Sequence, residues 1–123
     1  MRECGSCTAC CMTHSVPSLG KKAGERCAHL TEQGCGIYET RPPECRSYFC
    51  LWADEKAEAL DLPEWSRPDR IGIVLNAQGH DLNKQPVLIA AEVEKGASRS
   101  YWVGKLMNRT RLKPFAVAVR KTT

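Results

Sequence analysis

All eight cysteines of this 123-residue chain lie between Cys4 and Cys50, and the 73 residues that follow contain none. Thiols crowded in this way are explained by disulfides or by bound metal, and the redox compartment decides between the two. The N-terminus has no apolar run of signal-peptide length, and no stretch is apolar enough for a transmembrane helix. We therefore expect a cytoplasmic protein with no membrane partner, whose thiols hold metal rather than form disulfides.

The cysteine-rich segment contains few helix or strand patterns and many residues that interrupt them. These interruptions are Gly5, Pro17, Gly20, Gly24, Gly34, Gly36, Pro42 and Pro43. Such a segment cannot be stabilised by hydrophobic burial alone, and metal–thiolate bonds supply the missing free energy in modules of this kind. Residues 1–52 are therefore predicted to form an irregular metal-binding module.

Residues 53–123 have regular patterns instead. The run 51–62 favours a helix that Pro63 ends, with Trp52, Ala59 and Leu62 on one face. Strands are predicted at 71–75, 87–93 and 115–121. A helix is predicted over 98–110, with Ser98 as its N-cap and with a buried stripe of Trp102, Val103, Leu106 and Met107.

Together these elements predict an α+β fold. The cysteine-rich module is followed by a small three-stranded sheet with one or two helices, in the order helix and then strand–strand–helix–strand. The segment 63–69 that joins the patterned elements is short. We therefore expect one domain over residues 1–123.

The spacing of the thiols indicates metal more strongly than their number does. Cys4, Cys7 and Cys10 are separated by two residues each, and a two-residue spacer lets a tight turn aim two sulfurs at one ion. Cys11 follows directly, and Cys27, Cys35, Cys45 and Cys50 come from separate loops. All eight are candidate ligands. At least six are expected to bind, with Cys11 the first candidate for an exception because it adjoins Cys10.

Two kinds of metal suit such a thiolate set. Zinc takes four thiolates, so eight cysteines can hold two separate ions or one bridged pair. An iron–sulfur cluster also takes four, and the run C-x2-C-x2-C occurs in bacterial ferredoxins, where x3-C-P continues it. Here Cys11 and Met12 follow Cys10 instead, so we favour zinc narrowly over iron or an iron–sulfur cluster. No catalytic constellation is recognised, which leaves enzymatic activity open.

The whole first half resembles a known family. The segments CGSCTACC at 4–11 and GCGIYETRPPECRSYFC at 34–50, with Cys27 between them, are similar to the YkgJ-type cysteine-cluster family, whose opening signature is C-x2-C-x2-CC. The similarity covers roughly the first 52 residues. The family is described as a zinc- or iron-chelating domain, so the resemblance implies metal chelation by these cysteines.

Other residues are expected to support the metal or to bind partners. Arg41 is expected to donate hydrogen bonds to thiolate sulfurs or to cap carbonyls, and Tyr38, with Tyr48, Phe49 and Trp52, to pack over the metal. His14 and His29 can replace a thiolate, although a solvated or backbone-bonded histidine is favoured. From Arg99 onward there are seven basic residues and no acidic one. An adaptor that uses this basic face to hold a protein is thus an alternative, and nucleic acid is the less favoured partner.

Overall fold

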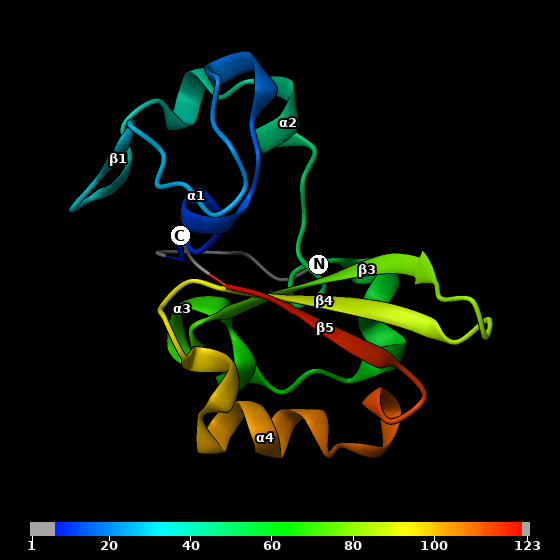
Figure 1. Cartoon of the computed structure of the whole chain (residues 1–123). Coiled ribbons are helices and arrows are strands. Elements are labelled where there is room, and N and C mark those ends of the chain that lie inside the picture. The colour runs from blue at the N-terminus through cyan, green and yellow to red at the C-terminus, as the bar shows by residue number, and fades with distance from the viewer. Residues whose placement is uncertain (1–6, 122–123) are drawn as a thin grey trace.

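The structure, a computed structural model, describes residues 7–121, so Cys4 lies outside the described residues. Figure 1 shows the chain in three levels, with the cysteine-rich segment above a twisted sheet and helix α4 (Tyr101–Met107) below it. Both helices and strands are present, with a three-stranded sheet. The predicted α+β fold class is confirmed.

The cysteine-rich part contains only short elements, none longer than four residues. They are α1 (Cys10–Thr13), η1 (Pro17–Leu19), β1 (Leu30–Thr31), β2 (Gly34–Cys35), η2 (Tyr38–Thr40) and α2 (Pro43–Arg46). Strands β1 and β2 form a small antiparallel hairpin. Elements of this length bury little apolar surface, so their arrangement depends on turns and on contacts with the rest of the chain.

The second part holds the regular sheet. Its elements are η3 (Glu55–Leu60), η4 (Glu64–Ser66), α3 (Pro68–Ile71), β3 (Ile73–His80), β4 (Pro86–Glu92), η5 (Ala97–Arg99), α4, η6 (Thr110–Leu112) and β5 (Ala116–Arg120). The strand order is β3-β4-β5, with β3 and β4 antiparallel and β4 and β5 parallel. A parallel neighbour requires a crossover connection, and η5, α4 and η6 form it.

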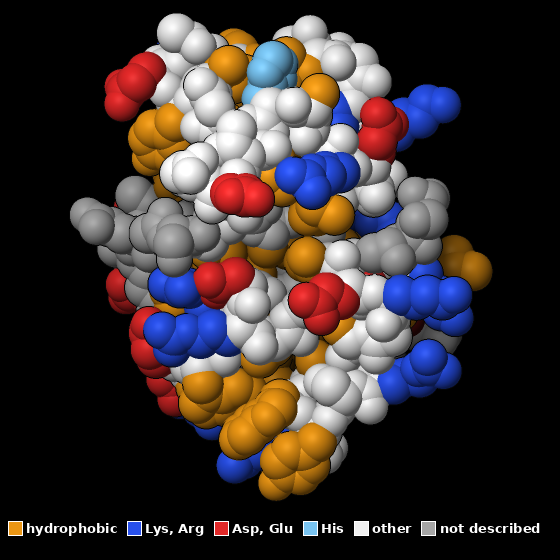
Figure 2. Space-filling model, turned by 90° about the vertical axis from the view of Figure 1, so that its left-hand side faces the viewer, with side chains coloured by type: hydrophobic (Ala, Val, Ile, Leu, Met, Phe, Trp, Pro, Cys, Tyr) orange, Lys and Arg blue, Asp and Glu red, His pale blue; other side chains and the backbone are white. Residues whose placement is uncertain are grey.

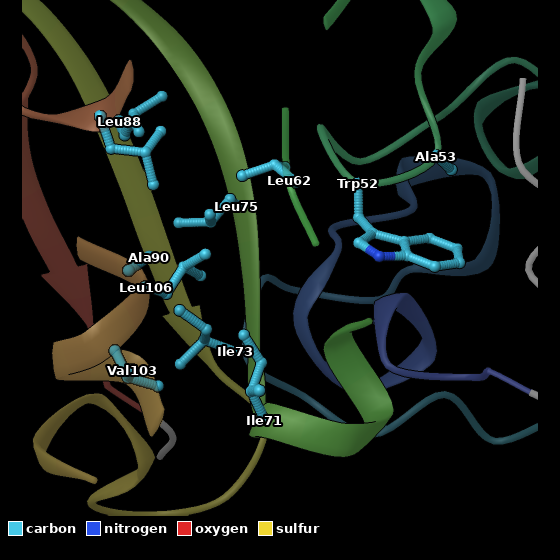
Figure 3. Close-up of a cluster of buried hydrophobic side chains, with 11 residues drawn as sticks. Trp52, Ala53, Leu62, Ile71, Ile73, Leu75, Leu88, Ala90, Val103 and Leu106 are labelled. Carbon is cyan, nitrogen blue, oxygen red and sulfur yellow. The ribbon is translucent and has the colours of Figure 1, made fainter. Parts of the chain in front are cut away.

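Side chains alternate between the two faces of the sheet along β3 and β4, and apolar residues lie on both faces. Ile73 and Leu75 point to one side, where they meet Leu88, Ala90 and the helix α4, as Figure 3 shows. Leu106 of α4 and Leu88 of β4 are completely buried there. Successive side chains of a strand point to opposite faces, so the residues between them, such as Val74, face the cysteine-rich part.

The cysteine-rich module covers this second face. Ala9 packs against Val74 of β3 and Ala91 of β4. The Tyr48 hydroxyl donates a hydrogen bond of 2.5 Å to the side-chain oxygen of Asn76 in β3. The module is therefore fixed to the sheet by apolar packing and by a polar contact between side chains.

The predicted helix over 51–62 is wrong in type and extent. The chain first runs beside β3, where the Leu51 amide donates to the Leu75 carbonyl at 3.0 Å. A 3-10 helix, η3, then begins after Asp54, whose carboxylate accepts from the Lys56 amide. Ala59 is exposed rather than on a buried face. Pairing with the sheet overrides the helix propensity of this run.

The predicted helix over 98–110 is shorter than expected and begins later. Its N-cap is Ser100, whose hydroxyl accepts from the Val103 amide at 3.2 Å. Ser98 instead donates its amide and its hydroxyl to the buried carboxylate of Glu92. Trp102 is 51% exposed and so lies outside the buried stripe. Because its contact with Glu92 holds Ser98 in the preceding turn, the helix begins at Tyr101 rather than directly after Ser98.

Within residues 7–121, no helix has the combination of length and apolar character that crossing a bilayer requires.

Replacing Leu106 by alanine is expected to lower the free energy of unfolding by about 2–5 kcal/mol, because it opens a cavity beneath the sheet. Chemical denaturation measures the change. The matched control is Leu82→Ala, since Leu82 is fully exposed in the β3–β4 loop and its truncation should cost no more than about 0.5 kcal/mol. Equal losses in the two variants would contradict the burial assigned to Leu106.

Candidate metal centre

The backbone brings Cys11 and Cys27 together. Cys11 lies in α1, and the chain then loops back, so that the Cys27 amide donates to the Cys11 carbonyl at 2.8 Å. The return depends on Gly24, which has a φ of 81° and donates its amide to the Thr13 carbonyl at 3.0 Å. A residue with a side chain rarely adopts this φ. This turn therefore positions Cys27, which is buried, beside α1.

The β1–β2 hairpin and helix α2 bring Cys35 and Cys45 to the same place. The Leu30 amide donates to the Cys27 carbonyl at 3.2 Å, and Leu30 pairs with Cys35 across the hairpin. Cys45 lies in α2, which begins at Pro43. Burial raises the pKa of the Cys45 thiol, and the negative charges of the other three thiols raise it further. Four thiols from four separate segments thus share one neighbourhood.

A buried lysine lies near two of these thiols, those of Cys11 and Cys27. Lys21 is only 6% exposed, and its ammonium donates to the His14 carbonyl. Reciprocal backbone hydrogen bonds with Val16, of 3.0 and 3.1 Å, fix its position. Burial lowers the pKa of Lys21, and the thiols of Cys27, Cys11 and Cys10, and then the carboxylate of Glu25, oppose that shift. A cation rarely occupies such a position without negative partners.

Sequence reasoning missed Lys21 because its neighbour Lys22 is exposed and has the same chemistry. Only the tight turn Pro17–Gly20 distinguishes the two positions. Gly20 has a φ of 66° and closes this turn by donating to the Pro17 carbonyl. The sequence shows the turn residues but not the side of the turn that is buried.

Arg41 is the second cation near the thiols. Its Nε donates to the Tyr38 carbonyl at 3.0 Å, and its guanidinium carbon lies 4.0 Å from the centre of the Tyr38 ring. Its positive charge favours the ionised form of the Cys11 and Cys45 thiols, and so acts to lower the pKa of each. Tyr38 itself is 59% exposed, so its ring supports Arg41 from the solvent side.

Of the thiols that the structure describes, that of Cys11 has the most perturbed pKa. A hydrogen bond from Cys10 is the main cause that lowers the pKa of Cys11 to about 7, and the charges of Lys21 and Arg41 lower it as well. Burial acts in the opposite direction. The thiolate is the form that binds metal and reacts with electrophiles. The residue singled out as a spectator therefore lies in the most favourable setting for ionisation.

Two of the three remaining described thiols lie against the sheet. Cys7 and Cys50 pack on the cluster around Ala9, and Cys10 at the start of α1 is exposed. Tyr48 lies beside them. Burial, and then the charge of Cys50, raises its pKa.

The histidines take other roles. His14 packs its ring on Tyr48, with centroids 4.0 Å apart, and burial lowers its pKa. The carbonyl of His29 accepts from the Gly36 amide at 2.7 Å, and His80 is exposed at the end of β3.

In the described part of the chain, no three cysteine, histidine, aspartate or glutamate side chains are arranged to hold one ion. The thiols would therefore have to turn toward a metal as it binds. The donor set itself fits a thiolate-bound metal, because soft sulfurs are gathered with two cations that offset their charge.

The basic C-terminal residues are distributed over η5, α4, η6 and β5 rather than along one element. One of them, Arg109, is engaged by Asp61 through a contact of 3.3 Å. The exposed side chains of Tyr101 and Trp102 lie in the same region, and Figure 2 shows hydrophobic side chains gathered at the lower end of that view. The surface around Tyr101 and Trp102 lies on α4, away from the cysteine-rich segment (Figure 1).

No protein-family model, curated protein or solved structure matches the chain. The resemblance to the YkgJ-type family therefore remains a prediction from the cysteine spacing.

The metal-free, reduced protein should be alkylated at Cys11 at lower pH than at Cys45. Alkylation requires the thiolate, so the rate at Cys11 should be half-maximal near pH 7, where this thiol loses its proton. The rate at Cys45, whose pKa is raised, should still be increasing above pH 9, the usual value of a thiol. Timed iodoacetamide labelling with peptide mass spectrometry measures both rates. Identical pH profiles would contradict the assigned environments.

Proposed function

We propose that this chain is a metal-binding protein, in which the thiolates of Cys11, Cys27, Cys35 and Cys45 hold one metal centre. The observation that carries the proposal is the gathering of these thiols from α1, the following loop, β2 and α2, with the buried ammonium of Lys21 near Cys11 and Cys27. Burying a lysine is costly unless its charge has a partner. Thiolates around a metal would be that partner.

Charge balance supports four thiolates rather than fewer. A divalent ion bound by four thiolates carries two excess negative charges, and so does an oxidised four-iron cluster with four thiolates. Lys21 and Arg41 supply two positive charges beside these thiols. In a poorly solvated site, uncompensated charge is strongly destabilising, so the two cations would make either centre nearly neutral.

Zinc is the ion that we place first, and iron or an iron–sulfur cluster is the alternative. Four thiolates complete the tetrahedral coordination of zinc and leave no open position for water, so zinc would serve a structural role here. A cluster would supply one-electron redox chemistry instead. In both cases the cysteines bind, and Lys21 and Arg41 orient and neutralise them.

A structural role agrees with the composition of the module. Its helices and strands have at most four residues each, and such short elements are not stable by themselves. Metal binding would connect segments that are far apart in the sequence, and its free energy would contribute to folding.

Elemental analysis and ultraviolet–visible spectra of protein purified anaerobically from iron-supplemented cells test the metal assignment. We expect zinc near stoichiometry and no visible absorption, because zinc has a filled d shell. Stoichiometric iron and sulfide with a brown colour would show that the centre is an iron–sulfur cluster rather than zinc. Protein that contains neither metal, and takes up neither when reduced, would disprove the proposed function.

Replacing Lys21 by methionine should weaken metal binding by roughly 10- to 100-fold, the usual effect of losing a group that supports metal ligands. Methionine retains most of the length of the side chain without its charge. Lys22→Met is the matched control, because Lys22 is adjacent and exposed. The affinity of this variant for the metal should equal that of the wild-type protein. Competition with a chelator of known affinity measures both. Equal affinities would show that the charge of Lys21 does not support the centre.

A further inference from the structure

We propose that two copies of this chain pair through strand β5, in an antiparallel arrangement centred on Ala118, so that their sheets become one continuous sheet. The inference goes beyond the proposed function, because it concerns the edge of the sheet and uses none of the thiols. It rests on the open edge of β5, on two exposed valines there, and on a charge pattern that a second copy matches.

Strand β5 lies at the edge of the sheet, and its outer side has no partner in the described part of the chain. It pairs only with β4, in an unbroken register from Ala116 to Arg120, and it lies at the front of the sheet in Figure 1. Successive residues of a strand direct their backbone N–H and C=O groups to opposite sides, so β4 uses only about half of these groups. The others can form a ladder with another strand.

The opposite edge of the sheet is protected. The Leu51 amide donates to the Leu75 carbonyl of β3 at 3.0 Å, and the register of β3 against β4 is irregular between Ala77 and His80. Covering segments, bulges, prolines and charged side chains keep edge strands from pairing with other chains. β5 has none of these before Arg120. The chain therefore blocks pairing at one edge of its sheet and leaves it open at the other.

Two valines of β5 form an exposed apolar strip along the open edge. Val117 lies opposite Leu88 and Val119 lies opposite Ala90 in the register with β4, so each valine points to the same face as its partner. Leu88 and Ala90 are buried in the core that α4 covers, whereas Val117 and Val119 are 40% and 45% exposed. The apolar face of the sheet therefore continues beyond the helix to this edge.

The residues of β5 match a second copy in the antiparallel direction. With the two Ala118 residues opposite each other, each Val117 lies opposite Val119 of the other copy, which gives two apolar cross-strand pairs. Arg120, the only charged residue of β5, then lies opposite Ala116. The two Arg120 residues are about 13 Å apart along the strands, at about 3.3 Å per residue, and salt screens charges at that distance. In a parallel pair with the same residues opposed, the two arginines would be adjacent and would repel each other.

A two-fold pair also closes the assembly. Each copy contributes the same edge, so both open edges are covered at once and neither can recruit a further chain. Lys113 and Lys121 flank the strand and are exposed, so water and salt screen their repulsion. A ladder between two short strands buries less area than a standard interface. We therefore expect a dimer that dissociates on dilution.

Sedimentation equilibrium of the protein as purified, with reductant to exclude intermolecular disulfides, tests the inference. The mass should approach that of a dimer by roughly 500 µM protein and should not rise further. Amide exchange followed by NMR locates the contact, because the outward-facing amides of β5 should exchange more slowly at high concentration, while those of β3 should not change. A monomer at all concentrations would overturn the proposal, and so would a dimer without added protection in β5.

Two double variants test the antiparallel register. Val117→Lys/Val119→Lys places lysine opposite lysine in both cross-strand pairs, whereas Val117→Glu/Val119→Lys places glutamate opposite lysine in both. The same exposed side chains are replaced, so a difference between the variants reports pairing rather than folding. The Kd of the first should exceed that of the second by roughly 5- to 30-fold. Leu82→Lys, an exposed change in the β3–β4 loop, should dimerise like the wild-type protein. Equal dissociation constants for the two double variants would overturn the proposed pairing.

Discussion

The structure depends on a sheet that is apolar on both faces and can bury only one of them with its own helix. Leu88 and Ala90 of the central strand point to α4, whereas Ala91 points the other way and is just as buried. Leaving such residues in water would cost hydrophobic free energy. The cysteine-rich module, which lacks a large core of its own, covers this second face through Ala9 and Tyr48. The sheet thus gives an irregular segment a fixed position.

The position of the thiols follows from that contact. The segments before α1 and after α2 are both held against β3 and β4, so the loop between them must fold back over the sheet. Within that loop, Lys21 is buried on the inner side of a tight turn, among sulfurs. A buried ammonium and clustered thiolates stabilise each other's charged forms. Packing therefore gathers the thiols, and electrostatics favours their ionised form.

The sequence predicted the regular half of the fold well, because alternation in strands and the helical stripe of Val103 and Leu106 reflect burial directly. It failed where a tertiary contact competed with local propensity. Ser98 was predicted as an N-cap but binds the buried Glu92, and Leu51 bonds to β3 before a shorter 3-10 helix forms at Glu55–Leu60. Trp102 has the spacing of a core residue, yet it lies at the edge of the helix stripe and is half exposed.

For the candidate site, the sequence by itself determined which side chains are available and predicted thiolate chemistry. Eight thiols before residue 51, with two-residue spacers and Arg41 nearby, indicate a thiolate site for a soft metal. Only the tertiary structure decided which thiols lie together and which lysine joins them. Spacing fixes the distance between cysteines two or three residues apart. Cys11, Cys27, Cys35 and Cys45 are brought into one region by a left-handed glycine, a hairpin and the face of a distant sheet, and these contacts cannot be read from a linear pattern.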